Sequence, residues 1–145
     1  TQSRSSAASD VYKRQSLKHE KIQENHIEKL SSTNGETNFE HYFTYEAMET
    51  YTIKLAQQYP NLVKRDVIGK SIEGRDIFAL KISSASEFGK NPIIFMDAGT
   101  HAREWVGPHT VLYLIDQLVT NSSVSAELLE KVDWVIIPNA NPDGE

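Results

Sequence analysis

The chain contains no cysteine, which excludes a framework of disulfide bonds and leaves the redox compartment unmarked. It has no apolar run of 18 or more residues, so no bilayer-spanning helix is expected. Positive charge is not in excess, because the formal net charge is −5 at pH 7; neither nucleic acid nor a membrane is therefore expected as a partner. An initiator methionine, an apolar signal core and an internal repeat are also absent. What remains, 145 residues of which 39% are hydrophobic, is enough for one modest domain.

The first 15 residues include a segment that matches the translation of a DNA adaptor. Ser5–Gln15 are the residues that a transposase adaptor used in sequencing-library preparation encodes. We therefore predict residues 1–15 to be a non-native scar, with a native Ser-rich leader as the alternative. Residues 16–38 follow as a short amphipathic stretch with a thin apolar stripe and then a polar linker.

The pattern of residues 39–83 predicts a helix followed by a hairpin. Thr44 is a plausible N-cap, and the helix should end before Pro60, because the residue preceding a proline is pushed out of the helical region. Two β-rich runs, 61–70 and 75–83, flank Glu73-Gly74, which is typical of a hairpin turn.

The remaining elements predict a strand–helix–strand unit. Residues 93–98 are typical of a strand buried on both faces, and a long apolar helix over 104–121 carries Pro108 in its first turn. A short helix over 125–131 and a strand over 132–138 complete the unit. The predicted fold class is α/β, a mixed parallel/antiparallel sheet with helices on both faces.

The most informative stretch is His101–Trp105, which follows the apolar run directly. It places an imidazole and a carboxylate three residues apart where a strand ends and a helix begins. These are ligands that Zn²⁺ accepts, and strand ends are where open α/β sheets present ligands. A single His-x-x-Glu pair also arises by chance, and two protein ligands do not complete a catalytic zinc site, which needs three and a water.

Three ordered segments resemble the metallocarboxypeptidases of the A/B type. His101–Trp105 resembles that family's zinc signature, Ile68–Arg75 its first hairpin, and Val135–Gly144 a later strand that ends in an Asn-Pro-x-Gly turn. The spacing of the segments is also similar, and the resemblance covers roughly residues 39–145. Glu145 departs from the pattern, because the family usually has an aromatic residue there.

The resemblance implies an incomplete carboxypeptidase-like fold. Residues 39–145 would form the N-terminal part of the catalytic domain, and residues 16–38 the tail of an activation segment with its linker. A disordered leader is the alternative for residues 16–38. It implies that His101 and Glu104 bind one zinc ion and that Arg103 contacts the substrate backbone. The family's third zinc ligand, its carboxylate-binding Arg, its mobile Tyr and its general-base Glu come later and have no counterpart here. No catalytic residue is therefore assigned within this chain, and the partial chain is expected to be inactive alone.

Other residues near the motif have plainer interpretations. Arg103 could form a surface salt bridge instead, and Trp105 is typical of a core aromatic. His109 is better explained as a core or surface histidine than as a third ligand. Asp97 could cap or support the ligand turn, and Asn139–Asp143 is first of all turn chemistry that could border a cleft.

The expected function is that of a secreted, zymogen-derived, zinc-dependent exopeptidase that hydrolyses the C-terminal peptide bond, with peptide and protein C-termini as substrates. One alternative is a catalytically inactive carboxypeptidase-like binding module. Another is an α/β domain in which the His101/Glu104 pair is coincidental. Separately, Asn121-Ser122-Ser123 is a glycosylation sequon, which has meaning only in a secreted protein.

Overall fold

The computed structural model describes residues 39–85 and 87–144. The chain divides into two compact units, Thr1–His41 and Tyr42–Glu145, and the described helices and strands all belong to the second. The predicted scar over residues 1–15 and the amphipathic stretch and linker over residues 16–38 lie outside the described residues.

The first helix, α2 (Tyr45–Gln58), begins where the sequence predicts it. The hydroxyl of Thr44 accepts a hydrogen bond from the backbone N–H of Ala47 at 3.3 Å, which satisfies one of the donors that a helix start leaves without an intrahelical partner. The helix ends one residue before Tyr59, its C-cap. The residues that face the core recur at helical spacing: Tyr45, Met48, Tyr51, Thr52 and Leu55.

The predicted hairpin is confirmed as β1 (Val63–Lys70) and β2 (Asp76–Ile82), which pair antiparallel. The turn between them contains Gly74 at φ 85°, a left-handed conformation that glycine adopts without the steric cost of a Cβ. Its backbone N–H donates to the carbonyl of Ser71 at 3.1 Å.

The remaining strands, β3 (Ile93–Asp97) and β4 (Asp133–Ile137), pair in parallel, and β4 pairs antiparallel with β2. Between them lie α3 (Val106–Thr120) and α4 (Ser122–Lys131). The strand order is β1-β2-β4-β3. The predicted mixed parallel/antiparallel α/β sheet is thereby confirmed.

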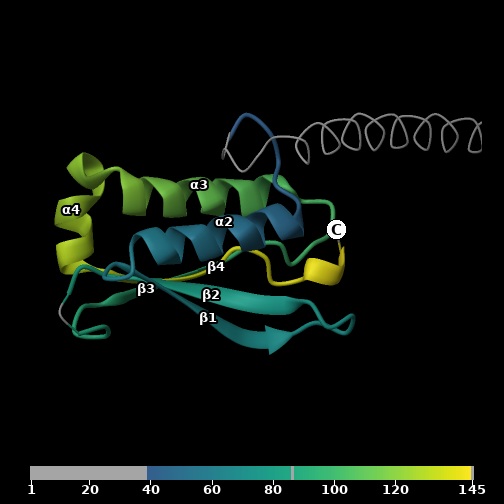
Figure 1. Ribbon diagram of the computed structural model, residues 1–145, viewed down its shortest axis with the longest axis horizontal. Coiled ribbons are helices and arrows are strands. Elements are labelled where there is room, and N and C mark those ends of the chain that lie inside the picture. The colour runs from purple at the N-terminus through teal and green to yellow at the C-terminus, as the bar shows by residue number, and fades with distance from the viewer. Residues whose placement is uncertain (1–38, 86, 145) are drawn as a thin grey trace, which may run out of the picture. The chain divides into compact units, whose positions relative to one another are not determined.

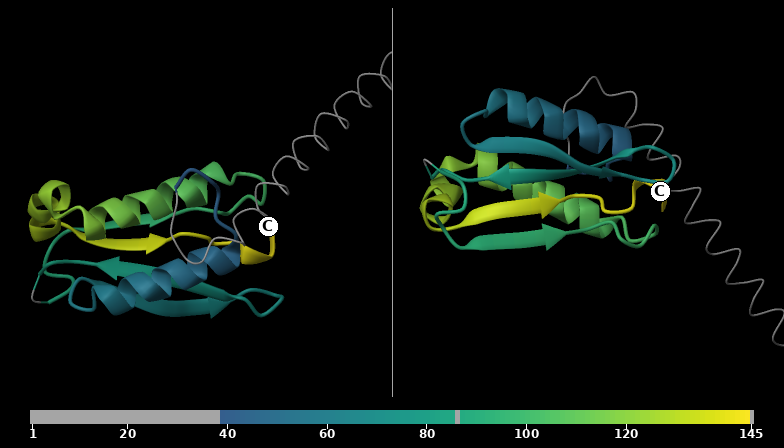
Figure 2. Two further views of the ribbon diagram at one scale, coloured as in Figure 1. Left: turned by 45° about the horizontal axis from the view of Figure 1, so that its top comes forward. Right: turned by 90° about the horizontal axis from the view of Figure 1, so that it is seen from below.

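Helices α2 and α3 lie over the same face of this sheet (Figure 1). Figure 2 shows α2 toward the β1 edge and α3 toward the β4 and β3 side. The two helices meet where the Tyr51 hydroxyl donates to the Asp116 carboxylate at 2.6 Å. Burial, and then this bond to an anionic acceptor, raise the pKa of Tyr51. Beneath the helices the core is densely apolar, with Phe78, Leu80, Ile82 and Ile136 no more than 1% exposed.

The prediction that residues 93–98 form a strand buried on both faces was wrong in its burial. Ile93 is 51% exposed and Phe95 is 59% exposed. The physical reason is position: β3 is an edge strand in this sheet, and α2 and α3 both lie over the other face. Helices α2 and α3 therefore cover only one of the two faces of the sheet. Within the described residues, no helix is long and apolar enough to cross a membrane.

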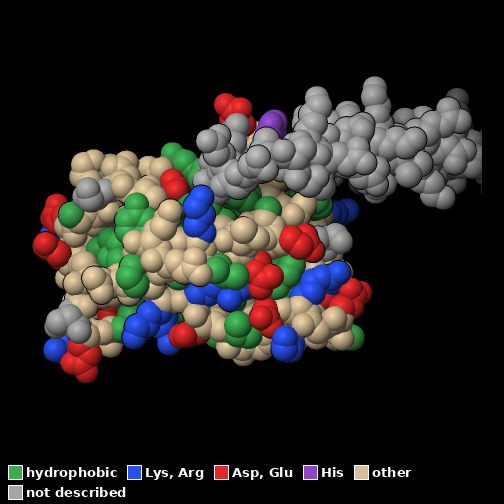
Figure 3. Space-filling model, in the orientation of Figure 1, with side chains coloured by type: hydrophobic (Ala, Val, Ile, Leu, Met, Phe, Trp, Pro, Cys, Tyr) green, Lys and Arg blue, Asp and Glu red, His purple; other side chains and the backbone are tan. Residues whose placement is uncertain are grey.

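Surface charges on the face shown in Figure 3 are mixed in sign, with Lys and Arg interspersed among Asp and Glu over the lower part, where β1 and β2 lie. Two ion pairs join these strands, Lys70 with Asp76 at 2.6 Å and Lys81 with Asp66 at 2.8 Å. Exposed pairs of this kind contribute little stability, typically below about 1 kcal/mol.

A buried carboxylate fixes the connection between β2 and β3. Asp133 is 0% exposed, and its oxygens accept hydrogen bonds from the Ser83 hydroxyl at 2.6 Å, the Gly89 N–H at 2.6 Å and the Asn91 side chain at 3.3 Å. Burial alone raises the pKa of Asp133, but these hydrogen bonds outweigh it and leave the pKa below its usual value.

Replacing Asp133 by Asn is expected to lower the free energy of unfolding by about 3 kcal/mol, because one amide oxygen cannot serve donors on both sides and a buried donor loses its partner. The wild-type contribution is fully present above the unfolded pKa of about 3.9 and is lost as pH falls from there through the lower folded pKa. Urea unfolding of the purified protein at several pH values measures the loss in Asp133→Asn and the pH dependence of the wild-type stability. Asp66→Asn, on an exposed ion pair, is the matched control, and an equal loss in the two variants would contradict the assignment.

Candidate metal centre

The segment that joins β3 to α3, residues 98–105, is hereafter the ligand loop. It leaves the strand through Gly99, whose φ is 71°, and then folds into turns. The backbone N–H of Glu104 donates to the carbonyl of His101 at 3.1 Å, and the N–H of Gly107 donates to that of Glu104 at 3.1 Å. These turns hold His101 and Glu104 one turn apart. The predicted helix start at 104 is two residues early, because α3 begins at Val106.

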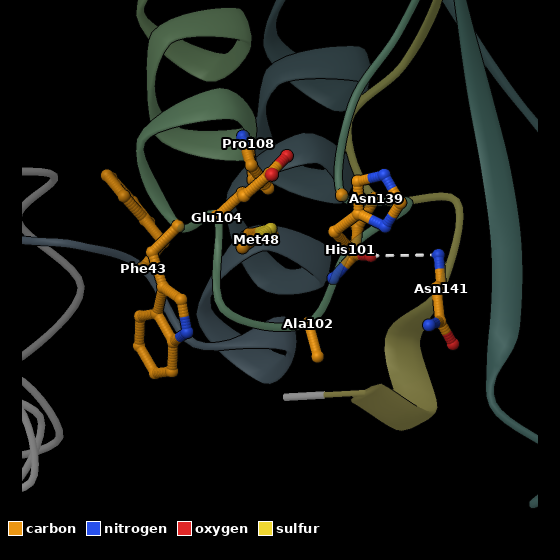
Figure 4. Close-up of a pocket in the computed structure, with 10 residues that line it drawn as sticks. Phe43, Met48, His101, Ala102, Glu104, Pro108, Asn139 and Asn141 are labelled. Atoms are coloured by element: carbon orange, nitrogen blue, oxygen red, sulfur yellow. Dashed lines mark hydrogen bonds between the residues drawn. The ribbon is translucent and has the colours of Figure 1, made fainter. Parts of the chain in front are cut away.

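The ligand loop brings His101 and Glu104 to one place. Both residues line the same pocket and also the same open groove of about 520 Å³, which runs along the end of β3 and the start of α3. Figure 4 shows the imidazole and the carboxylate on the same side of the loop, while the methyl group of Ala102 points to the other side. Both side chains are exposed, so an ion or a substrate can reach them.

The side chains of His101 and Glu104 are both of types that bind zinc. A neutral imidazole and a carboxylate are two of the ligand types that catalytic zinc sites use, with a third protein ligand and a water completing the tetrahedron. Among residues 39–85 and 87–144, no group of three His, Cys, Asp or Glu side chains could hold a metal ion. The described part of the chain thus offers a pair of ligands and not a complete site.

The segment after β4, residues 139–144, supports the ligand loop from below; it is hereafter the η1 turn, after the short 3-10 helix η1 (Pro142–Gly144) that it contains. The backbone N–H of Asn141 donates to the carbonyl of Gly99 at 3.1 Å. The side-chain amide of Asn141 donates to the carbonyl of Thr100 at 3.2 Å, directly before His101. Asn141 is held in turn by the Asn139 side-chain oxygen, which accepts its N–H at 3.1 Å (Figure 4).

Two glycines allow this close approach. A Cβ at Gly99 would stand 2.6 Å from the side-chain oxygen of Asn139 and 3.0 Å from its Cα. A Cβ at Gly144 would stand 3.0 Å from the Cβ of Ala102. The backbone of each glycine therefore lies directly against a residue of the other segment, Gly99 against Asn139 and Gly144 against Ala102.

The η1 turn is itself tied to the β1–β2 hairpin. Asp143 accepts hydrogen bonds from the N–H of Glu73 at 3.0 Å and from the guanidinium of Arg75 at 2.8 Å. The Ser71 hydroxyl and then these two donors lower the pKa of Asp143. The bonds to Asp143 and then to Glu73 raise the pKa of Arg75. Arg75 and Glu73 thus link the hairpin turn to the η1 turn. Their contacts with Asp143 span 70 positions from Glu73 and 68 from Arg75, and carry no local sequence signal.

The structure also places the other residues near the motif. Arg103 is exposed and lines neither the pocket nor the groove, and none of the ion pairs among the described residues includes it. Asp97 lines the groove and is exposed at the end of β3. Both side chains are therefore open to solvent.

The aromatic residues pack behind the ligand loop. Trp105 lines the pocket and meets the ring of Tyr42 edge-on at 6.2 Å. The ring of His109 lies 5.3 Å from that of Tyr42 and 5.8 Å from that of Phe43. His109 is part of this aromatic packing and does not line the groove.

The mixed sheet makes this an α/β protein, and the imidazole and carboxylate that follow the parallel strand β3 give it a candidate metal site. The chain matches the zinc carboxypeptidase family over residues 48–145, and it belongs to that family. Carboxypeptidase B of Astacus astacus is 38% identical to it over 103 residues, which are 71% of this chain and 33% of that relative.

The fold agrees with this membership. The crystal structure of carboxypeptidase A from Helicoverpa armigera matches with a TM-score of 0.77 and 32% identity, over 88% of this chain and 32% of that one. A protein of Uncinocarpus reesii named as an inactive metallocarboxypeptidase is 35% identical over 124 residues, which are 80% of this chain and 21% of that relative. The chain thus spans about a fifth to a third of the length of the proteins it matches.

Proposed function

We propose that this chain supplies the first part of the catalytic domain of a secreted zinc exopeptidase, one that removes C-terminal residues from peptides and proteins after activation of a zymogen. Family membership supports a metallocarboxypeptidase. The single observation that carries the proposal is the shared groove at the end of β3, which is lined by both His101 and Glu104. The third ligand and the general base would come from residues beyond this chain.

In this proposal the chain's own residues bind and orient. His101 would hold zinc through one ring nitrogen, with the other nitrogen free to donate a hydrogen bond that sets the tautomer, and Glu104 would bind through its carboxylate. A zinc ion held there would supply the Lewis acidity that polarises a peptide carbonyl and activates water. Arg103, exposed beside the pair, meets backbone oxygens of the substrate, because planar guanidinium donors match such oxygens in pairs. The Asn141 bonds to the ligand loop keep the His101 backbone in place.

The full-length product tests this function directly. After removal of the activation segment, it is expected to release amino acids one at a time from peptide C-termini, and 1,10-phenanthroline is expected to reduce release to background. Substrates with an amidated C-terminus serve as the control, since an exopeptidase that needs the terminal carboxylate should spare them. Activity that survives the chelator, or no activity after activation, would contradict the proposal.

A second candidate, an inactive binding module with the same scaffold, also has an observation in its favour. The relative named as inactive matches a larger share of this chain than does the carboxypeptidase B of Astacus astacus. Similarity over this part of the domain is therefore compatible with both outcomes. The two candidates differ in the residues that follow: a downstream His and a late Glu support the enzyme, and their replacement supports the binding module.

A further inference from the structure

The sequon Asn121-Ser122-Ser123 is the only Asn-x-Ser/Thr triplet in the chain, and it stands at the junction of two helices. α3 ends at Thr120 and α4 begins at Ser122. Asn121 between them has φ −100° and ψ 73°, so the chain leaves the helical path for one residue. Oligosaccharides on asparagine occupy surface positions of this kind.

The side chains of the sequon already contact each other. The Ser123 hydroxyl, on an exposed residue, donates to the Oδ1 of Asn121 at 2.8 Å. The Nδ2 of Asn121 donates to the Oε1 of Gln117 at 3.2 Å. An N-linked sugar replaces one of the two hydrogens on Nδ2, and the other hydrogen can keep the bond to Gln117. The folded structure can therefore carry a substituent at this nitrogen.

The start of α4 does not depend on a cap from the Asn121 side chain. That side chain makes no capping hydrogen bond at the start of α4; the backbone carbonyl of Asn121 accepts the N–H of Ser125 at 3.1 Å instead. A backbone bond of this kind survives both glycosylation and substitution of the side chain. Variants at position 121 should therefore fold.

The sequon is also remote from the candidate metal centre. The ligand loop precedes α3 and Asn121 follows it, and a helix of 15 residues separates them by roughly 22 Å. Figure 1 shows α4 at one end of the sheet and η1 at the other. A glycan at Asn121 would leave the groove beside His101 and Glu104 open.

We propose that Asn121 is an acceptor for an N-linked oligosaccharide. The Nδ2 atom forms a bond to the anomeric carbon of an oligosaccharide carried on a lipid diphosphate. The bond from that carbon to the diphosphate oxygen breaks, the lipid diphosphate leaves with the electron pair, and Nδ2 loses one proton. The modification rests on the proposed passage through the secretory pathway, but it does not rest on zinc binding or on peptidase activity.

Expression in insect cells tests the proposal in two forms, the gene from its own start codon and the chain behind a cleavable signal peptide. In both, peptide N-glycosidase is expected to lower the mass of the secreted protein and to convert Asn121 to Asp, which tandem mass spectrometry locates. Asn121→Gln and Ser123→Ala should abolish the mass shift, whereas Ser123→Thr, which keeps the hydroxyl, should retain it.

The outcomes separate this site from the proposed function. A signal-fused chain without glycan, or a mass shift that persists in Asn121→Gln, overturns the site itself. A glycan on the signal-fused chain but not on the product from the native start codon overturns the modification of the native protein, together with its proposed secretion. A glycosylated protein without peptidase activity leaves the site standing and counts only against the exopeptidase.

Discussion

Replacing His101 by Asn is expected to lower the zinc affinity of the full-length protein by more than about 100-fold, since losing a residue that only orients a ligand already costs roughly 10- to 100-fold. C-terminal release by the activated protein should fall to background in parallel. The physical reason is that His101 is the imidazole in the groove that Glu104 also lines. Competition against a chromophoric chelator measures the affinity, and elemental analysis measures the stoichiometry.

His109→Asn is the matched control. His109 lies eight residues further on and packs against the rings of Tyr42 and Phe43, so its loss should lower the melting temperature but leave one zinc per chain. Glu104→Gln should behave as His101→Asn does, because it keeps the shape of the side chain and removes the anionic ligand. Full zinc occupancy in His101→Asn, or an equal loss of zinc in His109→Asn, would remove the basis for the assigned pair.

The sequence predicts those features whose causes lie within a few residues. The N-cap at Thr44 acts on Ala47, and the end of α2 is set by the proline that follows Tyr59. The hairpin turn needs only the left-handed Gly74 between two β-rich runs. The proximity of His101 and Glu104 belongs to the same group, because one turn of the ligand loop produces it.

Features made by distant segments were not predictable in the same way. Residues 93–97 are apolar enough for a strand covered on both faces, yet the exposure of β3 depends on which elements lie beside it. The bond from Arg75 to Asp143 spans 68 positions, and the contact of Gly99 with Asn139 joins the ends of two neighbouring parallel strands. Three Asn or Asp residues at alternate positions after β4 are a weak signal for this support, because such residues are common in any turn.

Gly99 offers the sharpest test of that support. Gly99→Ala is expected to lower the free energy of unfolding by about 2–4 kcal/mol, in the range that strain and overpacking produce, and to weaken zinc binding by roughly 10- to 100-fold. Two costs combine: an L-residue at φ 71° is strained, and the new Cβ meets Asn139 at 2.6 Å. Asn139 must then move, and Asn141 moves with it, away from the carbonyl of Thr100.

Two other glycines separate these costs. Gly74→Ala carries the strain of a positive φ with nothing within 4 Å of the new Cβ, and Gly69→Ala carries neither the strain nor the contact. We expect Gly74→Ala to lose about 1–2 kcal/mol and Gly69→Ala to remain within about 1 kcal/mol of the parent, with unchanged zinc affinity in both. Urea unfolding and the chelator competition give the two readouts. If Gly99→Ala matched Gly74→Ala in both, the close packing of the ligand loop on the η1 turn would have no part in positioning His101.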